Sequence, residues 1–390
     1  MPDESVEILL IGGGVASVRC ARALRRHGHA GSIVIVGDEP HPPYNRPPLS
    51  KELMRDDEVP FDLVVAEPPS WYERRRIGLR TDAAVASLDP GQRLVTLADG
   101  GRIRYERCLI ATGAAPRRLP IPGAEHAHLL RTVDDATAIR ERAVGGARAV
   151  LIGGGFIGVE VAASLAARSV VVTVLELAPS LWGGQLGEEL SAWAVGVLGA
   201  AGVSVRLATA ADRIEPGAVQ VSGAHLAADL VIAGVGVTPR VELARGAGLR
   251  LDDGIVTDAR HATSASGVWA AGDVARIDGS RVEHWHAARE GGERAALSML
   301  GRPLPAPRAP WVFSEFAGQQ LDVVGLPGAE DEAQVIGDRT ADAFAVAFLR
   351  DGQVSAIGIV NSAIDVEEAR RLVERRAALQ ELLSLGPQAR

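Results

Sequence analysis

Lysine is almost missing from this sequence of 390 residues. Lys51 is the only lysine, so all the other basic residues, out of 41 lysines and arginines together, are arginine. Heavy use of alanine, arginine and glycine offers one explanation, a bias of composition. The alternative is that position 51 needs a compact ammonium group, because the planar guanidinium of arginine is larger and packs differently. The four prolines at 42, 43, 47 and 48 would stiffen the approach to such a site.

Cysteine is also scarce. Only Cys20 and Cys108 are present, far apart and in no CxxC pair. Small secreted domains and zinc modules use several cysteines at close spacing. The count therefore argues against a disulfide framework, a zinc site and a dithiol redox centre, and we expect no metal.

Long hydrophobic runs and an excess of positive charge are absent as well. The longest uncharged apolar stretch, near residues 193–205, is too short to span a bilayer. The net charge of −8 disfavours a nucleic-acid partner. The first residues, "MPDES", are acidic where a signal peptide is basic. We expect a cytoplasmic globular protein with no nucleic-acid or membrane partner.

The pentapeptide "LIGGG" occurs twice, at 10–14 and at 151–155. Each copy follows a short apolar run and precedes an alanine-rich segment with helical spacing and then a β-branched run. Strand, glycine turn, helix and strand follow one another in both places, which predicts two βαβ units. The helices are expected at 15–27 and 156–168, and the second strands at 32–37 and 170–176.

A second repeat supports the first. "LIATGAAPR" at 109–117 and "VIAGVGVTPR" at 231–240 are apolar runs that end in small residues and proline. After the proline-rich segment 301–310, several strand-like runs are followed by one expected helix over 366–383. Asp351-Gly352 between two apolar runs predicts a hairpin. The third unit is therefore expected to be α+β.

The second glycine turn carries a full GxGxxG motif at Gly153, Gly155 and Gly158. These glycines allow a tight turn, close approach of a pyrophosphate and close packing of helix on strand. Glu176, at the end of the next strand, stands where an acid binds the ribose 2′-hydroxyl of NAD. Leu177 and the residue after it offer no arginine for the phosphate of NADPH.

The first glycine turn has Gly12 and Gly14, with Ser17 in the third place, where a small residue suits the packing. Asp38 and Glu39 are its candidate acids. The alternative for both turns is a glycine-rich loop that binds no ligand. Two such units in one chain, each with its acid, favour two dinucleotides, and proteins of that kind pass a hydride between a nicotinamide and a flavin.

The chain resembles the FAD-dependent, NADH-oxidising ferredoxin reductases, a family that includes putidaredoxin reductase and the reductase components of aromatic dioxygenases and shares the glutathione-reductase-like fold. The resemblance covers nearly the whole chain. It is carried by the segments "IGGGVAS", "VGDEPHPPYNRPPLSK", "LIATGAAPRRLPIPG", "LIGGGFIGVE", "GVGVTPRVELARGAGL", "TSASGVWAAGDV" and "EHW".

The resemblance implies an α/β fold of two Rossmann-like dinucleotide-binding domains and a C-terminal α+β interface domain. An FAD domain at 1–115 and 240–308 is split by an NAD domain at 116–239, and the interface domain spans 309–390. FAD and NADH are the implied cofactors.

The resemblance also implies roles for individual residues. Gly12, Gly14 and Glu39 hold the adenosine half of FAD, and Arg46 lies near the pyrophosphate. Thr112 and Gly113 form a backbone crossing beside FAD. Asp273 bonds the ribityl chain and places the N-terminus of a helix at the flavin. The remaining implied cofactor-binding positions are Ser17, Asp38, Val85, Ala111, Gly236 and Gly272.

Lys51 and Glu160 are implied as a charge pair beside the isoalloxazine ring, with Trp285 near flavin and nicotinamide. The residues themselves agree in part. Glu160 closely follows the third glycine of the NAD motif, where an acid is badly placed against phosphate unless a cation pairs with it. NADH peroxidases and coenzyme A disulfide reductases look similar here but have a cysteine near position 51. This chain has no cysteine between Cys20 and Cys108, so we do not expect it to reduce disulfides through a thiol of its own.

Two places depart from the family pattern. Phe313, Ser314, Glu315 and Phe316 stand where relatives have tryptophan and then Ser-Asp-Gln, and His286-Ala287 stand where relatives have asparagine or threonine. These departures bear on which electron acceptor the protein serves.

Three surface patterns have ordinary alternatives. "HWH" at 284–286 would put two histidines on one face of a strand, but a third metal ligand is missing. The arginine runs at 73–80 and 368–376 are either solvated faces with interspersed glutamates or a docking patch for an acidic ferredoxin.

The hypothesis that follows is an NADH-dependent FAD reductase that passes single electrons to an iron–sulfur ferredoxin of the [2Fe-2S] type, which supplies a cytochrome P450 or a Rieske-type oxygenase. Lys51, Glu160 and Trp285 are the expected catalytic residues. The enzymatic alternatives are a rubredoxin reductase and an NADH oxidase. A redox-sensing flavoprotein that acts as an interaction partner is the alternative of another class.

Overall fold

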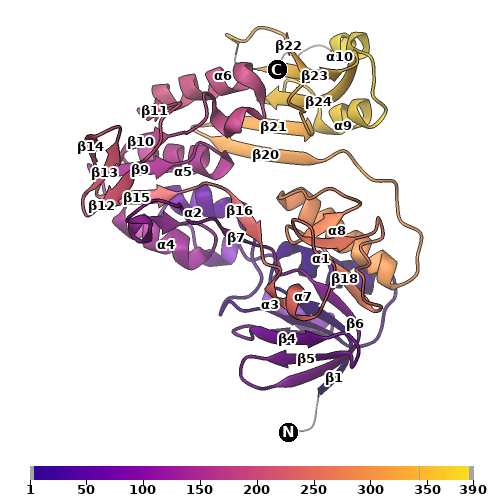
Figure 1. The fold of residues 1–390 in the computed structure, drawn as a ribbon. Coiled ribbons are helices and arrows are strands. Elements are labelled where there is room, and N and C mark those ends of the chain that lie inside the picture. The colour runs from indigo at the N-terminus through magenta and orange to yellow at the C-terminus, as the bar shows by residue number, and fades with distance from the viewer. Residues whose placement is uncertain (1–3, 342, 386–390) are drawn as a thin grey trace. The chain divides into compact units, whose positions relative to one another are not determined.

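The computed structural model describes residues 4–341 and 343–385 (Figure 1). The chain divides into two compact units of three segments each. The first comprises Met1–Asn45, Pro60–Ala115 and Val237–Pro307, and the second Arg46–Val59, Pro116–Gly236 and Arg308–Arg390. The expected domains at 1–115 with 240–308, 116–239 and 309–390 include residues 1–3, 342 and 386–390, which lie outside the described residues. That three-domain division stays a prediction.

In its described part, the first unit is built on a seven-stranded sheet in the order β3-β2-β1-β6-β5-β4, with β18 paired to β6. The strand β6 pairs in parallel with β1 and β18 and antiparallel with β5. Strand β6 is long enough for both neighbours on one edge, because its first residues pair with β5 and its last residues pair with β18. The strands are β1 (Glu4–Ile11), β2 (Ile33–Val36), β3 (Ile77–Arg80), β4 (Val85–Asp89), β5 (Leu94–Leu97), β6 (Arg102–Ile110) and β18 (Val268–Ala270).

Two long helices of the first unit, α1 (Val15–Arg26) and α8 (Trp285–Met299), lie side by side (Figure 1). The small buried residues Ala16 and Ala21 of α1 and Gly292 of α8 let the helices approach closely. The other elements are η2 (Phe61–Leu63), α3 (Pro69–Arg74), α7 (Glu242–Gly246), the parallel pair β17 (Ile255–Thr257) and β19 (Ala275–Ile277), and the paired strands β7 (Ala114–Pro116) and β16 (Val237–Pro239).

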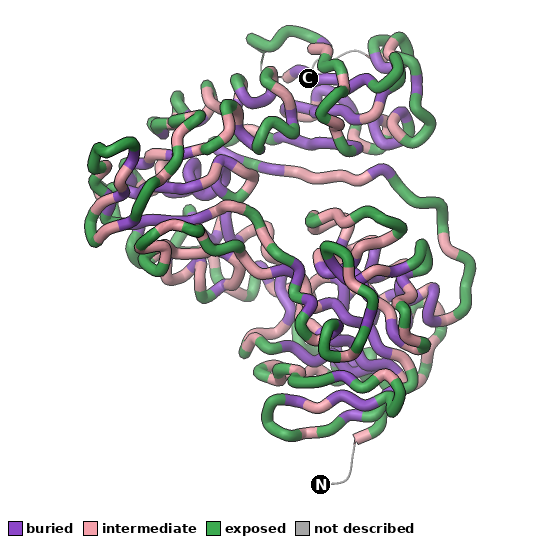
Figure 2. The backbone as a smooth tube through the Cα atoms, viewed as in Figure 1, coloured by how far each residue is buried: buried purple, intermediate pink, exposed green. Residues whose placement is uncertain are grey.

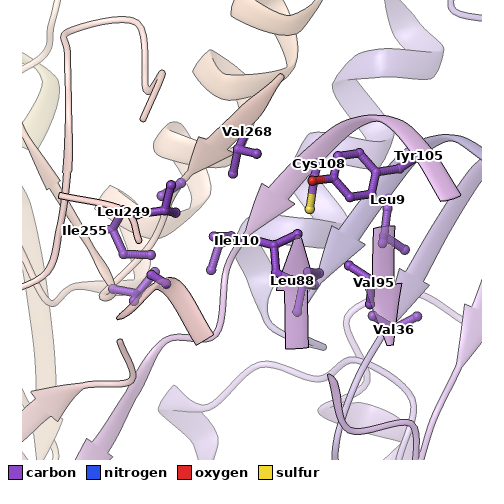
Figure 3. Packing of buried hydrophobic residues seen from close by; sticks show 14 of the residues in the cluster. Leu9, Val36, Leu88, Val95, Tyr105, Cys108, Ile110, Leu249, Ile255 and Val268 are labelled. Atoms are coloured by element: carbon purple, nitrogen blue, oxygen red, sulfur yellow. The ribbon is translucent and has the colours of Figure 1, made fainter. Parts of the chain in front are cut away.

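One hydrophobic core of the first unit lies against one face of the sheet. Figure 3 shows Leu9 and Val95 together with Cys108, Ile110 and Val268, all at most 1% exposed. These residues come from neighbouring strands and from the segment after α7. Such apolar burial on neighbouring strands is typical of a sheet that is covered on both faces, and much of the backbone at the centre of this unit is buried (Figure 2).

The first part of the second unit contains a parallel sheet in the order β11-β10-β9-β15-β8 and an antiparallel sheet in the order β12-β13-β14. Helix α4 begins with a capping box between Thr132 and Asp135. The strands are β8 (His128–Leu129), β9 (Arg148–Ile152), β10 (Val171–Leu175), β11 (Ser204–Arg206), β12 (Arg213–Glu215), β13 (Ala218–Val221), β14 (Ala224–Ala227) and β15 (Leu230–Ala233). The helices are η1 (Pro47–Ser50), α2 (Glu52–Arg55), η3 (Ala124–His126), α4 (Val133–Arg142), α5 (Phe156–Ala167), η4 (Leu181–Gly184) and α6 (Gly187–Ala200).

The C-terminal part of the second unit is an antiparallel sheet in the order β20-β21-β24-β23-β22 with two helices. The predicted hairpin joins β23 to β24, and Asp351 and Gly352 have φ of 53° and 74°, as a tight two-residue turn requires. The elements are β20 (Trp311–Phe316), β21 (Gln319–Gly325), β22 (Glu332–Ile336), β23 (Phe344–Arg350), β24 (Gln353–Val360), α9 (Val366–Glu374) and α10 (Leu379–Leu385).

The α/β fold and both predicted βαβ units are confirmed. Helices α1 and α5 begin where expected and end within one residue of the predicted ends, with His27 and Arg168 as their C-terminal caps. One prediction was wrong. The single helix over 366–383 is broken between α9 and α10, where Arg376 adopts a φ of 49° that a continuous helix does not allow. Strand β22 was not predicted.

Candidate functional site

The first glycine loop joins β1 to α1. Gly12 has a φ of 118°, and a Cβ atom there would lie 2.1 Å from the carbonyl oxygen of Ala111. Only glycine therefore fits this turn. Gly14 is the N-cap of α1 and supplies no side chain to cap it. Ser17 is fully buried under the loop, and its hydroxyl has no hydrogen-bond partner among the described residues.

The two candidate acids of this loop follow β2. Asp38 pairs with Arg240 at 2.8 Å. The carboxylate of Glu39 accepts a hydrogen bond from the hydroxyl of Tyr44, which is itself 4% exposed. Tyr44 therefore orients Glu39, which favours Glu39 over Asp38 as the residue that holds a ribose.

The second glycine loop joins β9 to α5 in the same way. Gly153 has a φ of 110°, and a Cβ atom there would lie 2.4 Å from the carbonyl oxygen of Gly234. Gly155 is the N-cap of α5, again with no side-chain cap, and Gly158 is buried in its first turn. The carboxylate of Glu176 accepts hydrogen bonds from the backbone N–H of Gly154 at 2.5 Å and of Ala178 at 2.8 Å. The acid that was predicted for the ribose thus lies directly against the glycine loop.

Lys51 and Glu160 form the ion pair that was expected from the sequence. The ammonium nitrogen Nζ lies 2.8 Å from Oε2 of Glu160. Lys51 is 6% exposed and Glu160 is 5% exposed, so both charges are nearly closed to water. Lys51 stands between η1 and α2, after the prolines of η1, and Glu160 lies on α5 within the same unit.

Two hydroxyl groups complete this pair. Ser50 donates to Oε2 of Glu160 at 2.5 Å, and Ser314 donates to Oε1 at 2.7 Å. Lys51 also lies 3.4 Å from the carbonyl oxygen of Pro47 and 5.4 Å from the centroid of the Phe313 ring. We call Ser50, Lys51, Glu160 and Ser314 the Glu160 cluster. The sequence did not indicate the two serines as part of it, because neither occupies a position in a glycine motif.

The remaining expected positions are distributed over several loops. Thr112 donates its hydroxyl to the carbonyl oxygen of Arg240 at 2.8 Å, and the Gly113 carbonyl accepts from the Arg240 N–H at 3.0 Å. Ala111 is buried and precedes them. Gly236 has a φ of 94°, Val85 begins β4, and Arg46 donates to the backbone carbonyl of Arg131 in the second unit.

Gly272 packs against α1 at the N-terminus of that helix, since a Cβ atom there would lie 3.4 Å from the Cβ of Ala16. Asp273 lies in a turn that leads into strand β19, and the next helix, α8, begins at Trp285. The role of Asp273 beside the flavin stays a prediction. Trp285 donates its indole N–H to the side chain of Asn45 at 3.1 Å.

The sequence interpretation placed the histidines of "HWH" on a strand, and that placement was wrong. His284 is the N-cap of α8 and His286 lies in its first turn. Within residues 4–341 and 343–385, no group of three or more His, Cys, Asp and Glu side chains could hold a metal ion. In the same part of the chain, no helix is both long and apolar enough for a membrane crossing.

Cys20 and Cys108 are free, fully buried thiols. Burial raises the pKa of both thiols far above the usual value, because the apolar surroundings disfavour the thiolate. Neither thiol therefore offers the reactive thiolate that disulfide exchange needs.

The two arginine runs differ in their surroundings. In the second run, Arg370 is buried against the Ala309 carbonyl, and Arg375 pairs with Glu381. The first run helps to line a surface pocket of about 930 Å³, which we call the arginine pocket. Its lining residues are Arg22, Arg25, Arg26, Trp71, Arg74 and Arg75. The second run is therefore divided between a buried arginine and one that pairs with a glutamate, whereas the first run contributes to a cluster of positive charge on an acidic protein.

Both glycine loops fit a bound dinucleotide. The leading N–H groups of a helix have no partner within the helix, and the glycine caps of α1 and α5 provide no side chain to satisfy them. Such helix N-termini bind pyrophosphate well. The acids Glu39 and Glu176 stand at the strand ends where ribose hydroxyls are bound.

Comparisons with known proteins agree with this geometry. The family model described as pyridine nucleotide-disulphide oxidoreductase matches residues 6–292, and the model described as reductase C-terminal matches residues 311–386. The biphenyl dioxygenase system ferredoxin–NAD(+) reductase component of Paraburkholderia xenovorans is 35% identical over 98% of this chain and 97% of its own. The chlorobenzene dioxygenase ferredoxin reductase component of a Cupriavidus species is 36% identical over 96% of this chain and 94% of its own.

Among solved structures, the covalent putidaredoxin reductase–putidaredoxin complex contains a chain with a TM-score of 0.91 and 32% identity, over 96% of this chain and 94% of that one. An NADH:rubredoxin oxidoreductase of Clostridium acetobutylicum, at 21% identity, shares the fold with a TM-score of 0.76. The chain belongs to the pyridine nucleotide-disulphide oxidoreductase family, and its C-terminal part matches the reductase C-terminal domain.

Proposed function

We propose that this protein is an NADH-dependent, FAD-containing ferredoxin reductase. The observation that supports this most is the buried ion pair between Lys51 and Glu160, because Glu160 lies on α5, the helix that begins at the second glycine loop. A buried ion pair is costly to maintain and adds little to stability over an apolar pair. Its position directly after a dinucleotide-binding loop therefore favours a role in the chemistry.

In this proposal each glycine loop binds one dinucleotide. Gly12, Gly14 and Glu39 hold FAD, and Gly153, Gly155 and Glu176 hold NADH. FAD, when bound, supplies the ability to take a hydride from a nicotinamide and to release electrons singly. The chain's own residues bind and orient the two cofactors and keep water away.

We assign Lys51 to the edge of the flavin ring, where its ammonium group would favour added negative charge. Glu160 limits that effect and fixes the position of the ammonium group. Trp285, held by Asn45, is assigned to the neighbourhood of flavin and nicotinamide. These three residue roles are part of the proposal and are carried over from the resemblance.

The electron acceptor is proposed to be a small [2Fe-2S] ferredoxin that supplies a Rieske-type oxygenase or a cytochrome P450, in the cytoplasm. The two curated relatives described above are named as reductase components of dioxygenase systems, and the structural neighbour was solved with putidaredoxin. A rubredoxin acceptor, direct oxidation of NADH by oxygen and a sensor role are the competing outcomes.

The test is a screen of acceptors with the purified protein reconstituted with FAD. We expect about one FAD for each chain and rapid, NADH-dependent reduction of a [2Fe-2S] ferredoxin, with rubredoxin and oxygen as poorer acceptors. A protein that binds no FAD, or whose flavin stays reduced in a long-lived complex with NAD and passes electrons to no acceptor, would contradict the proposal.

A further inference from the structure

The carboxylate of Glu160 has three donors around it. Lys51 and Ser50 both donate to Oε2, at 2.8 Å and 2.5 Å, whereas Ser314 donates to Oε1 at 2.7 Å. An ionised carboxylate can only accept hydrogen bonds, so both hydroxyl groups must point their protons at it. The lysine therefore shares one oxygen with a competing donor, while the other oxygen is held separately.

The side chains of the cluster are nearly closed to water. Ser50 is 5% exposed and Ser314 is fully buried. Ser164 of α5 donates to the backbone carbonyl of Ser50 at 2.8 Å and so holds the segment that carries both Ser50 and Lys51. A buried charge needs such hydrogen bonds, because water is not available to solvate it.

Ser314 comes from β20, in the segment that matches the reductase C-terminal domain. The same strand carries Phe313, whose ring lies 5.4 Å from the ammonium group of Lys51. Strand β20 thus contributes to both members of the ion pair, the hydroxyl to the carboxylate and the aromatic ring to the ammonium. The C-terminal segment is part of the cluster and not only a surface for partners.

We propose that Ser50 and Ser314 are positioning residues that keep part of the Glu160 charge off Lys51 and thereby set how strongly Lys51 favours the reduced flavin. This inference rests on the proposed function, which assigns Lys51 to the flavin edge. Each hydroxyl takes up some of the hydrogen-bonding capacity of the carboxylate. When a hydroxyl is removed, the carboxylate relies more on the ammonium group and neutralises it more fully.

The inference predicts an order of effects. Ser50→Ala leaves Oε2 to Lys51 alone, whereas Ser314→Ala leaves the shared oxygen unchanged and weakens only the support on Oε1. Both variants should move the flavin midpoint potential to more negative values, Ser50→Ala further. Reduction by NADH should slow about three- to tenfold, a fraction of what a full hydrogen bond to a charged group is worth.

A matched control is Ser298→Ala. Ser298 is also buried and its hydroxyl accepts one hydrogen bond, but from the neutral indole N–H of Trp269 at 3.0 Å. The control measures how far the loss of a buried hydroxyl group changes the flavin potential and the reduction rate when that hydroxyl does not contact a charged group. Its flavin potential and reduction rate should stay close to those of the wild type.

Two measurements test the inference. The first is a double-mutant cycle on urea unfolding of the FAD-loaded protein, with Ser314→Ala and Glu160→Gln introduced separately and together, and the same cycle for Ser50→Ala. We expect a measurable coupling energy between each of Ser50 and Ser314 and Glu160, and none between Ser298 and Glu160. The second is the flavin midpoint potential and the rate of anaerobic reduction by NADH in the holoproteins.

The outcomes separate the inference from the function it rests on. If wild type is reduced by NADH but Ser50→Ala and Ser314→Ala match Ser298→Ala in potential, the two serines are structural only and the inference is wrong. Absence of coupling in the unfolding cycle contradicts it equally. If the wild type binds no FAD or is not reduced by NADH, the proposed function itself fails.

Discussion

Replacement of Lys51 is the perturbation that bears most directly on the ion pair. At the observed separation of 2.8 Å, the attraction between the two charges is ~6 kcal/mol for an effective dielectric constant of about 20. Much of this offsets the cost of removing both charges from water. The loss of one partner leaves the other buried and unpaired, which costs about 3–5 kcal/mol.

We therefore expect Lys51→Met and Glu160→Gln each to lower the free energy of unfolding by about 3–5 kcal/mol. The double variant should be less destabilised than the sum of the two by at least about 2 kcal/mol, because it leaves no unpaired charge. Urea unfolding of the four proteins, followed by circular dichroism, gives the coupling energy. Additive single effects would refute the reasoning.

Lys51→Arg separates charge from shape. The variant keeps the positive charge and should keep fold and FAD, but the larger planar guanidinium does not fit between Glu160, Phe313 and the Pro47 carbonyl. Stopped-flow reduction by NADH should be slower than in the wild type. Equal rates and equal flavin potentials would mean that the lone lysine reflects composition only.

Three further predictions concern the binding surfaces. Gly12→Ala should abolish FAD binding in a fluorescence titration, because Gly12 has a φ of 118° and the new Cβ would lie 2.1 Å from a backbone oxygen. Unchanged affinity for FAD would contradict the assignment of this glycine loop to FAD. Glu176→Ala should narrow the preference for NADH over NADPH, mainly through the KM for NADPH; a wild type that uses both equally well would contradict this assignment. Replacing Arg74 and Arg75 of the arginine pocket with glutamate should slow ferredoxin reduction several-fold at low ionic strength but not at high salt, where charges are screened. NADH-dependent flavin reduction should be unchanged, and a loss that persists in salt would exclude a steering role.

The glycine loops could be predicted because their signals are local. The strand, the glycines and the alanine-rich helix follow one another within about thirty residues. The observed ends of α1 and α5 therefore lie within one residue of the predicted ends. The two residues of the Lys51–Glu160 pair are more than one hundred positions apart, and the family resemblance implied their pairing, whereas the residues alone indicated only that Glu160 needs a cation as partner. The formation of this pair inside one unit is a finding of the structure.

Other features depended on contacts that no sequence pattern announces. Ser50 and Ser314 reach Glu160 from an η1 turn and from strand β20, and Tyr44 reaches Glu39 across a turn. The break between α9 and α10 requires a left-handed φ at Arg376, a position that glycine or asparagine usually occupies.

The most direct test of the central claim is an anaerobic experiment in two steps. The FAD-loaded protein is mixed with NADH and the loss of flavin absorbance is followed, and an oxidised [2Fe-2S] ferredoxin is then added. We expect fast bleaching of the flavin by NADH and not by NADPH, followed by reoxidation of the flavin as two equivalents of ferredoxin are reduced for each NADH consumed. A flavin that NADH does not bleach, or that ferredoxin leaves reduced, would contradict it.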